Sequence, residues 1–112
     1  MSKFDDLMVV YKEQLSSIGV AADETLLTAV AKGLGPSIYN TDSSKVSCSD
    51  TTEKERVKAN FLIKKLGMED STALDGAIEA VCQQIGSAER NKHRPVFYYL
   101  LVKHLGKEAV YA

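Results

Sequence analysis

The sequence is poor in several residue types that would point to a specialised protein. It has no tryptophan, two prolines and two cysteines, and its 14 basic and 15 acidic residues leave a formal net charge of −1. Such a balance gives no general attraction to nucleic acid or to anionic lipid, so we expect neither partner. The longest apolar run, residues 95–102, is too short to span a bilayer.

The two cysteines are too few for the disulfide framework of a small secreted domain. The first residues are charged and no apolar stretch follows them, so we expect no signal peptide and a cytoplasmic protein. In that compartment Cys48 and Cys82 are expected to be reduced. Cys82 falls on an apolar helical stripe and should be inert, whereas Cys48, in a polar loop, should react faster.

What the chain does contain is helical patterning. Its 112 residues are 45% hydrophobic, which is typical of one globular domain. Apolar residues recur at spacings of three and four, acidic or hydroxyl residues precede these stretches, and glycines follow them. The predicted helices are about Lys3–Ile18, about Glu24–Lys32 closed by Gly33, a segment capped by Asp50 and closed by Gly67, one from after Ser71 to Gly86, and one with Pro95 in its first turn that ends at Gly106.

These patterns predict an all-α fold: a single domain over residues 1–112, a compact array of about five helices around a buried C-terminal helix. The last helix carries seven consecutive apolar residues, Val96–Val102, which cover its whole circumference. Either the other four helices cover it, or a second copy of the chain does. We expect a homodimer, because aromatic residues are favoured in interface cores and two-fold dimers are the commonest oligomers.

The connection over residues 35–49 is long for a compact domain, and long connections are either functional or disordered. Ile38, Tyr39 and Val46 supply apolar anchors, so we expect it to be packed, with a helical turn after Pro36.

A basic cluster at the start of the last helix is the best candidate site. Cations there oppose the helix dipole unless they are paired, so a small anion or an acidic protein is the expected partner. The alternative is a solvated basic turn paired with nearby acidic side chains. The candidate anion or partner site comprises Arg90, Lys92, His93 and Arg94, with Tyr39, Asn40 and Asp42 from the long connection.

No pattern predicts catalysis, a metal or a cofactor. His93 and His104, eleven residues apart on one helix, would be separated by about 16 Å and cannot share a metal ion. A phosphate-binding glycine motif is absent. A reactive pair of Cys48 with a histidine is conceivable, but an inert loop cysteine is the better interpretation.

Three stretches together resemble a known family: residues 34–40, residues 48–50 with 57–62, and residues 90–101. They are similar to a family of short bacterial proteins catalogued only as a domain of unknown function. The resemblance covers nearly the whole chain. It implies a compact helical array in the bacterial cytoplasm, and it supplies no catalytic residue.

The sequence therefore favours a non-enzymatic binding or interaction module that self-associates. The alternative is a protein or enzyme that binds a small anionic ligand between the 35–50 loop and the start of the last helix. A pocket at that loop would favour the alternative, and a loop that packs flat would favour the interaction module.

Overall fold

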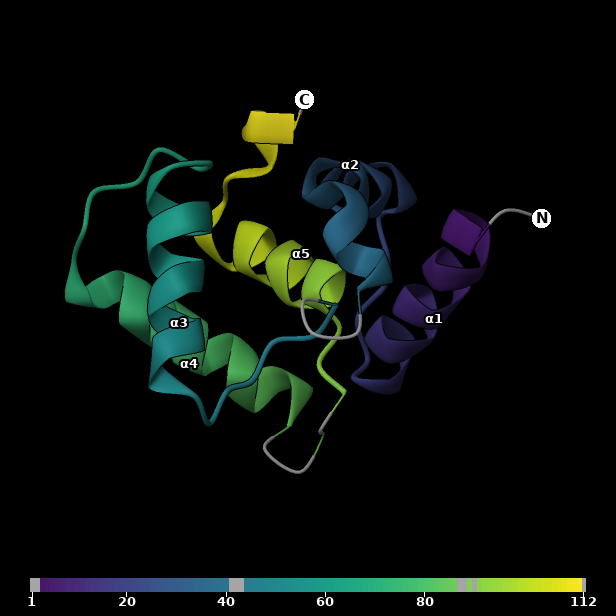
Figure 1. Cartoon of the computed structure of the whole chain (residues 1–112), viewed down its shortest axis with the longest axis horizontal. Coiled ribbons are helices and arrows are strands. Elements are labelled where there is room, and N and C mark those ends of the chain that lie inside the picture. Colours follow the sequence, from purple (N-terminus) through teal and green to yellow (C-terminus); the bar gives the residue numbers. More distant parts are fainter. Residues whose placement is uncertain (1–2, 41–43, 87–88, 90, 112) are drawn as a thin grey trace.

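The computed structural model describes residues 3–40, 44–86, 89 and 91–111. This part of the chain contains helices and no strand, although Lys45 and His93 form an isolated antiparallel bridge. The all-α prediction is therefore confirmed. The elements are α1 (Lys3–Ser17), α2 (Glu24–Leu34), the 3-10 helix η1 (Gly35–Tyr39), α3 (Thr51–Val57), the π-helix η2 (Lys58–Ile63), α4 (Thr72–Ile85), α5 (Arg94–Leu105) and the 3-10 helix η3 (Glu108–Tyr111) (Figure 1).

The core of the molecule is built around α5. This helix packs against α2 and α4 and also meets α1, and in Figure 1 it lies between α1 and α2 on one side and α3 and α4 on the other. Every residue from Pro95 to Val102 is buried within the single chain. A buried C-terminal helix is thus confirmed. The reason for expecting a dimer is removed, because the chain's own helices cover α5.

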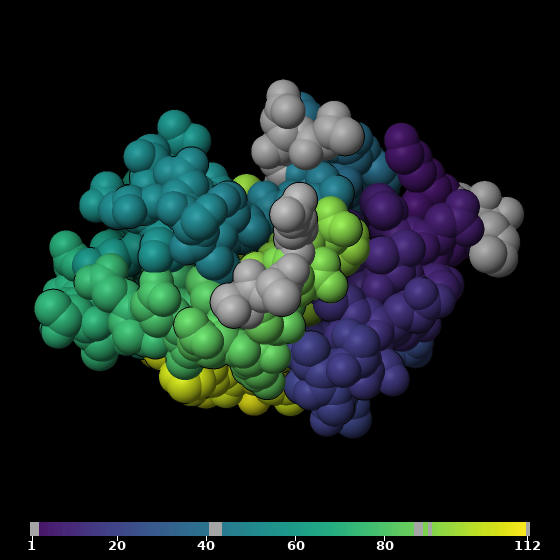
Figure 2. Space-filling model, turned by 90° about the horizontal axis from the view of Figure 1, so that it is seen from below, coloured from purple at the N-terminus to yellow at the C-terminus, as the bar shows by residue number. Residues whose placement is uncertain are grey.

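The N-terminal helices and the α3–α4 pair form opposite ends of the molecule. Figure 2, which views the structure at right angles to Figure 1, shows the teal α3 region beside the green α4, with the purple α1 at the other end. The ammonium of Lys54 on α3 lies 2.5 Å from the carboxylate of Glu79 on α4, and Lys58 in η2 pairs with Asp75 at 3.1 Å. These ion pairs bridge α3 and η2 to α4 on the outside.

Two helix caps were predicted correctly, and one helix end was misplaced. The carboxylates of Asp23 and Asp50 accept hydrogen bonds from the first free N–H groups of α2 and α3. Helix α2, however, continues past Gly33 to Leu34. Gly33 keeps a helical backbone, and the positive φ of 62° that ends the helix belongs to Gly35 instead.

The third predicted helix changes its hydrogen bonding midway. Over Lys58–Ile63 the α-helix widens into a π-helix, which brings Phe61 and Leu62 into the core. The ring of Phe61 stacks on that of Tyr98 in α5, with centroids 4.0 Å apart. No sequence signal predicted this local widening.

The long connection is packed, as expected, but through fewer anchors. The predicted helical turn after Pro36 is η1, and Ile38 and Val46 are buried. Tyr39 instead stays 42% exposed, with the Lys3 ammonium 5.4 Å from its ring centre. In the part of the chain that the structure describes, no helix has the length and apolar character that crossing a membrane requires.

Candidate functional site

The two cysteines form a disulfide bond. Cys48, just before α3, is joined to Cys82 in α4, with their Cα atoms 6.0 Å apart. The prediction of reduced thiols was therefore wrong, although the burial of Cys82 was right, since it is 4% exposed. Reduced thiols were predicted from the small number of cysteines and from the expected compartment. The bond forms because Val46 is buried in the core, which brings the next residues of the loop, Cys48 among them, onto α4.

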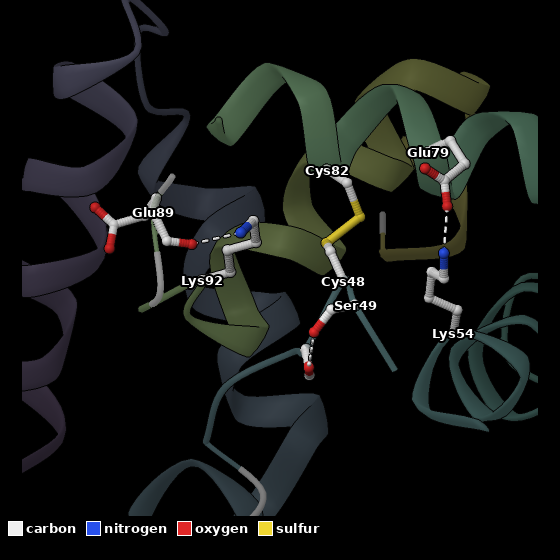
Figure 3. The surroundings of a disulfide bond; sticks show 8 residues. Cys48, Ser49, Lys54, Glu79, Cys82, Glu89 and Lys92 are labelled. Atoms are coloured by element: carbon white, nitrogen blue, oxygen red, sulfur yellow. Dashed lines mark hydrogen bonds and ion pairs between the residues drawn. A yellow bond between two sulfur atoms is a disulfide. The ribbon is translucent and has the colours of Figure 1, made fainter. Parts of the chain in front are cut away.

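The disulfide borders a hollow of about 360 Å³ at the surface. Three segments that are distant in the sequence surround it: the end of the long connection, the outer face of α4, and the chain just before α5 (Figure 3). The hollow therefore lies between the 35–50 loop and the start of the last helix, where the alternative function placed a ligand. Its lining residues are Val46, Ser47, Cys48, Ser49, Glu79, Cys82, Gln83, Glu89 and Lys92.

Lys92 is the unusual residue of this lining. It is 5% exposed, and it is the one charged residue that is buried among those described. Its ammonium donates a hydrogen bond to the backbone carbonyl of Glu89, and its own carbonyl accepts from Val46 N at 2.8 Å. Within the described residues Lys92 has no carboxylate partner. A largely buried cation thus lies at the hollow, and among the described residues its ammonium bonds to the Glu89 carbonyl.

Two carboxylates also line the hollow, but both are engaged elsewhere. Glu79 pairs with Lys54 at 2.5 Å. The carboxylate of Glu89 accepts a hydrogen bond from Asn91 N at 2.8 Å and faces away from the Lys92 ammonium (Figure 3). Neither therefore neutralises Lys92.

Arg94, in contrast, has a structural role inside the protein. Its guanidinium pairs with the carboxylate of Glu53 and donates to Tyr98 Oη at 3.0 Å and to the carbonyl of Lys45 at 3.1 Å. The two charged side chains are only 12% and 15% exposed. Burial opposes the charge on Arg94, but Tyr98 and Glu53 outweigh it and raise the pKa of Arg94. This pair ties α3 to α5.

The other predicted site residues do not converge on the hollow. His93 stands at the N-cap position of α5, and its backbone N–H donates to Gln14 Oε1 at 3.2 Å. Burial, together with the charge of Lys45, lowers the pKa of the His93 imidazole. The exposed Tyr39 lies at a separate hollow beside Phe4. Asn40 is exposed, and its carbonyl accepts from Ser44 N at 2.8 Å. Two further members of the predicted site, Arg90 and Asp42, lie outside the described residues.

Several lining residues were missed by the sequence reasoning, and a signal for three of them was present. Glu79, Cys82 and Gln83 are spaced by three and four residues, so they share a face of α4 next to its apolar stripe. The two polar residues beside the buried Cys82 are the sequence signal for this part of the lining. For Ser47 and Ser49 no pattern distinguishes them from the other serines of the loop.

The polar groups of the lining are suited to binding a small molecule. In the described ranges of the chain, no three histidine, cysteine or acidic side chains are grouped so that they could hold a metal ion. What the hollow offers is one ammonium, two carboxylates, two serine hydroxyls, the Gln83 amide and a disulfide.

Comparison with known proteins identifies a family and no activity. No curated protein matches the chain at a significant level. A family model described as "Protein of unknown function (DUF2853)" matches residues 10–109, which include the disulfide, the whole lining of the hollow and the buried helix α5. The chain belongs to this family, DUF2853.

Proposed function

We propose that the protein is a non-enzymatic binding module whose ligand is a small molecule with an anionic group, held at Lys92 in the hollow beside the disulfide. The observation that carries this proposal is the burial of Lys92 without a carboxylate partner among the described residues.

The energetics of Lys92 support a role outside folding. A lysine side chain that is almost fully buried is costly to the fold unless its charge is compensated, and a single backbone carbonyl compensates it only in part. A methionine or leucine would fill the same space more favourably. An anion that enters the hollow would supply the missing counter-charge.

The rest of the lining defines the class of ligand. The hydroxyl oxygens of Ser47 and Ser49 lie 3.3 Å apart at the rim and can donate to an oxyanion, as can the amide of Gln83. Glu79 is already neutralised by Lys54. A carboxylate or phosphate group on a small metabolite fits these donors best. The cytoplasm, as proposed from the sequence, is rich in such compounds.

Replacing Lys92→Met is expected to weaken binding of inorganic phosphate and of succinate at least about tenfold, because a hydrogen bond from a charged group contributes about 1.5–3 kcal/mol. The midpoint of thermal unfolding should stay equal or rise, since methionine fills the site without a buried charge. Isothermal titration calorimetry and a thermal scan measure the two quantities.

The matched control is Lys64→Met, which removes the same charge from an exposed position in another part of the chain. It should leave anion binding unchanged. If both variants bind as the unmodified protein does, or if both lose binding equally, the site is not at Lys92.

Self-association stays a prediction, now without support from α5. Two exposed valines on α1, Val9 at 44% and Val10 at 37%, are the apolar surface on that helix that a second copy could cover. Light scattering after size exclusion at micromolar concentration is expected to give twice the 12.2 kDa of one chain. A mass of one chain that does not change on concentration would show a monomer.

A further inference from the structure

We propose that the Cys48–Cys82 disulfide is a thiol-exchange site, at which a low-molecular-weight thiol carrying a carboxylate forms a mixed disulfide with Cys48. The exchange itself is carried by the accessibility of the bond. The preference for a carboxylate rests on the proposed function, because it uses the same Lys92.

The two cysteines of the disulfide differ in their exposure to solvent. Both cysteines line the hollow, but Cys82 is 4% exposed while Cys48, in the loop, is half-buried. An attacking thiolate approaches a sulfur from the side opposite the bond that breaks. Because Cys48 is the more exposed of the two cysteines that line the hollow, we expect the nucleophile to attack its sulfur rather than that of Cys82.

The exchange is balanced without any further reactant. The incoming thiolate bonds to Cys48 Sγ, the S–S bond breaks, and its electron pair goes to Cys82 Sγ. Burial disfavours a thiolate, so Cys82 takes a proton from water and becomes a thiol. The small thiol is oxidised to a mixed disulfide and Cys82 is reduced.

The fold around the bond is held by other interactions, so that the disulfide can open without unfolding the site. Val46 is 2% exposed, and its N–H donates to the carbonyl of Lys92 at 2.8 Å. Arg94 N donates to the carbonyl of Ser44, also at 2.8 Å. On the other side, Lys54 and Glu79 join α3 to α4. The segment that carries Cys48 is therefore anchored on both sides of the cysteine.

Lys92 gives this exchange its selectivity. Lys92 and both cysteines line the same hollow, and Figure 3 shows the Lys92 side chain beside the disulfide, so a carboxylate at Lys92 would leave the thiol end of a short ligand near Cys48. This geometry favours a thiol with a carboxylate over a neutral thiol of similar size.

The first experiment measures the rate at which the oxidised protein loses its disulfide to 3-mercaptopropionate and to 2-mercaptoethanol at equal thiolate concentrations. The ratio of the rate with the anionic thiol to the rate with the neutral thiol is expected to be several-fold higher in the unmodified protein than in the Lys92→Met variant. An unchanged ratio in Lys92→Met would overturn the carboxylate preference. Phosphate binding is measured separately and tests the proposed function independently of this rate ratio.

In the second experiment the protein supplies the thiol and the small molecule supplies the disulfide. This is needed because in the unmodified protein Cys82 can expel the bound thiol again. The Cys82→Ala variant is treated with the symmetrical disulfide of 3-mercaptopropionate, and intact mass spectrometry follows the adduct on Cys48. The matched variant Cys48→Ala leaves the buried Cys82 as the target. Faster modification of Cys82→Ala supports the proposal. Equal rates in two variants that are folded by circular dichroism would overturn it.

Discussion

Reduction of the disulfide is expected to lower the free energy of unfolding by about 4 kcal/mol, the largest effect predicted for this protein. The bond closes a loop with a sequence separation of 34 residues, and the chain-entropy model gives about that value for a loop of this length. For a domain of about this size such a loss corresponds to a fall of roughly 15 °C in the unfolding midpoint. Urea titrations of the same protein with and without a phosphine reductant measure the difference.

The reduced protein should nonetheless be folded at 25 °C, because the loop is also anchored by Val46 and by the Arg94–Glu53 pair. Far-UV circular dichroism of the two forms should be superimposable before denaturant is added. A difference below about 1 kcal/mol would mean that the loop is equally restricted in the reduced unfolded chain. Loss of helical signal on reduction would contradict the proposed exchange within a folded protein.

Replacing Glu53→Gln is expected to cost about 3 kcal/mol, the second largest effect. The carboxylate of Glu53 and the guanidinium of Arg94 are both largely buried, so the variant removes a buried ionic partner of Arg94. The amide that replaces the carboxylate can keep one hydrogen bond but not the ionic attraction. Denaturant unfolding of both proteins gives the difference in the free energy of unfolding, and the slopes of the two transitions should agree.

Glu79→Gln is the control for this prediction. It also removes a carboxylate from an ion pair between α-helices, but Glu79 is 52% exposed, and exposed pairs contribute at most about 1 kcal/mol. Equal costs for the two variants would show that the burial of the Arg94–Glu53 pair has no energetic consequence.

The fold was largely predictable because its signals are local. Helix periodicity and the caps Asp23 and Asp50 depend on residues three or four positions apart, and these interactions appear as expected in the structure. The two exceptions have different origins. Gly33 accepts helical geometry as readily as a terminating one, so that only the next turn, with Gly35, decides where α2 ends. The π-helix at Phe61 depends on packing against Tyr98, which lies 37 residues later.

The candidate site was only partly predictable, because its parts are joined by tertiary contacts. The region between the long connection and the last helix was identified from the sequence, and Lys92 was among the residues named there. Whether a cation in that cluster is paired or unpaired depends on which acidic residue reaches it. Glu53 reaches Arg94 from α3, and none of the described acidic residues pairs with Lys92. The disulfide likewise depends on the approach of α4 to a distant loop.

The central claim is that an anion binds at the hollow beside the disulfide, and a titration followed by heteronuclear NMR tests it most directly. Inorganic phosphate is added to the oxidised, ¹⁵N-labelled protein, and the amide shifts are mapped on the structure. The largest saturable shifts are expected at the residues that line the hollow, which are 46–49, 79, 82, 83, 89 and 92. Shifts that do not saturate, or that centre on exposed lysines elsewhere, would contradict the claim.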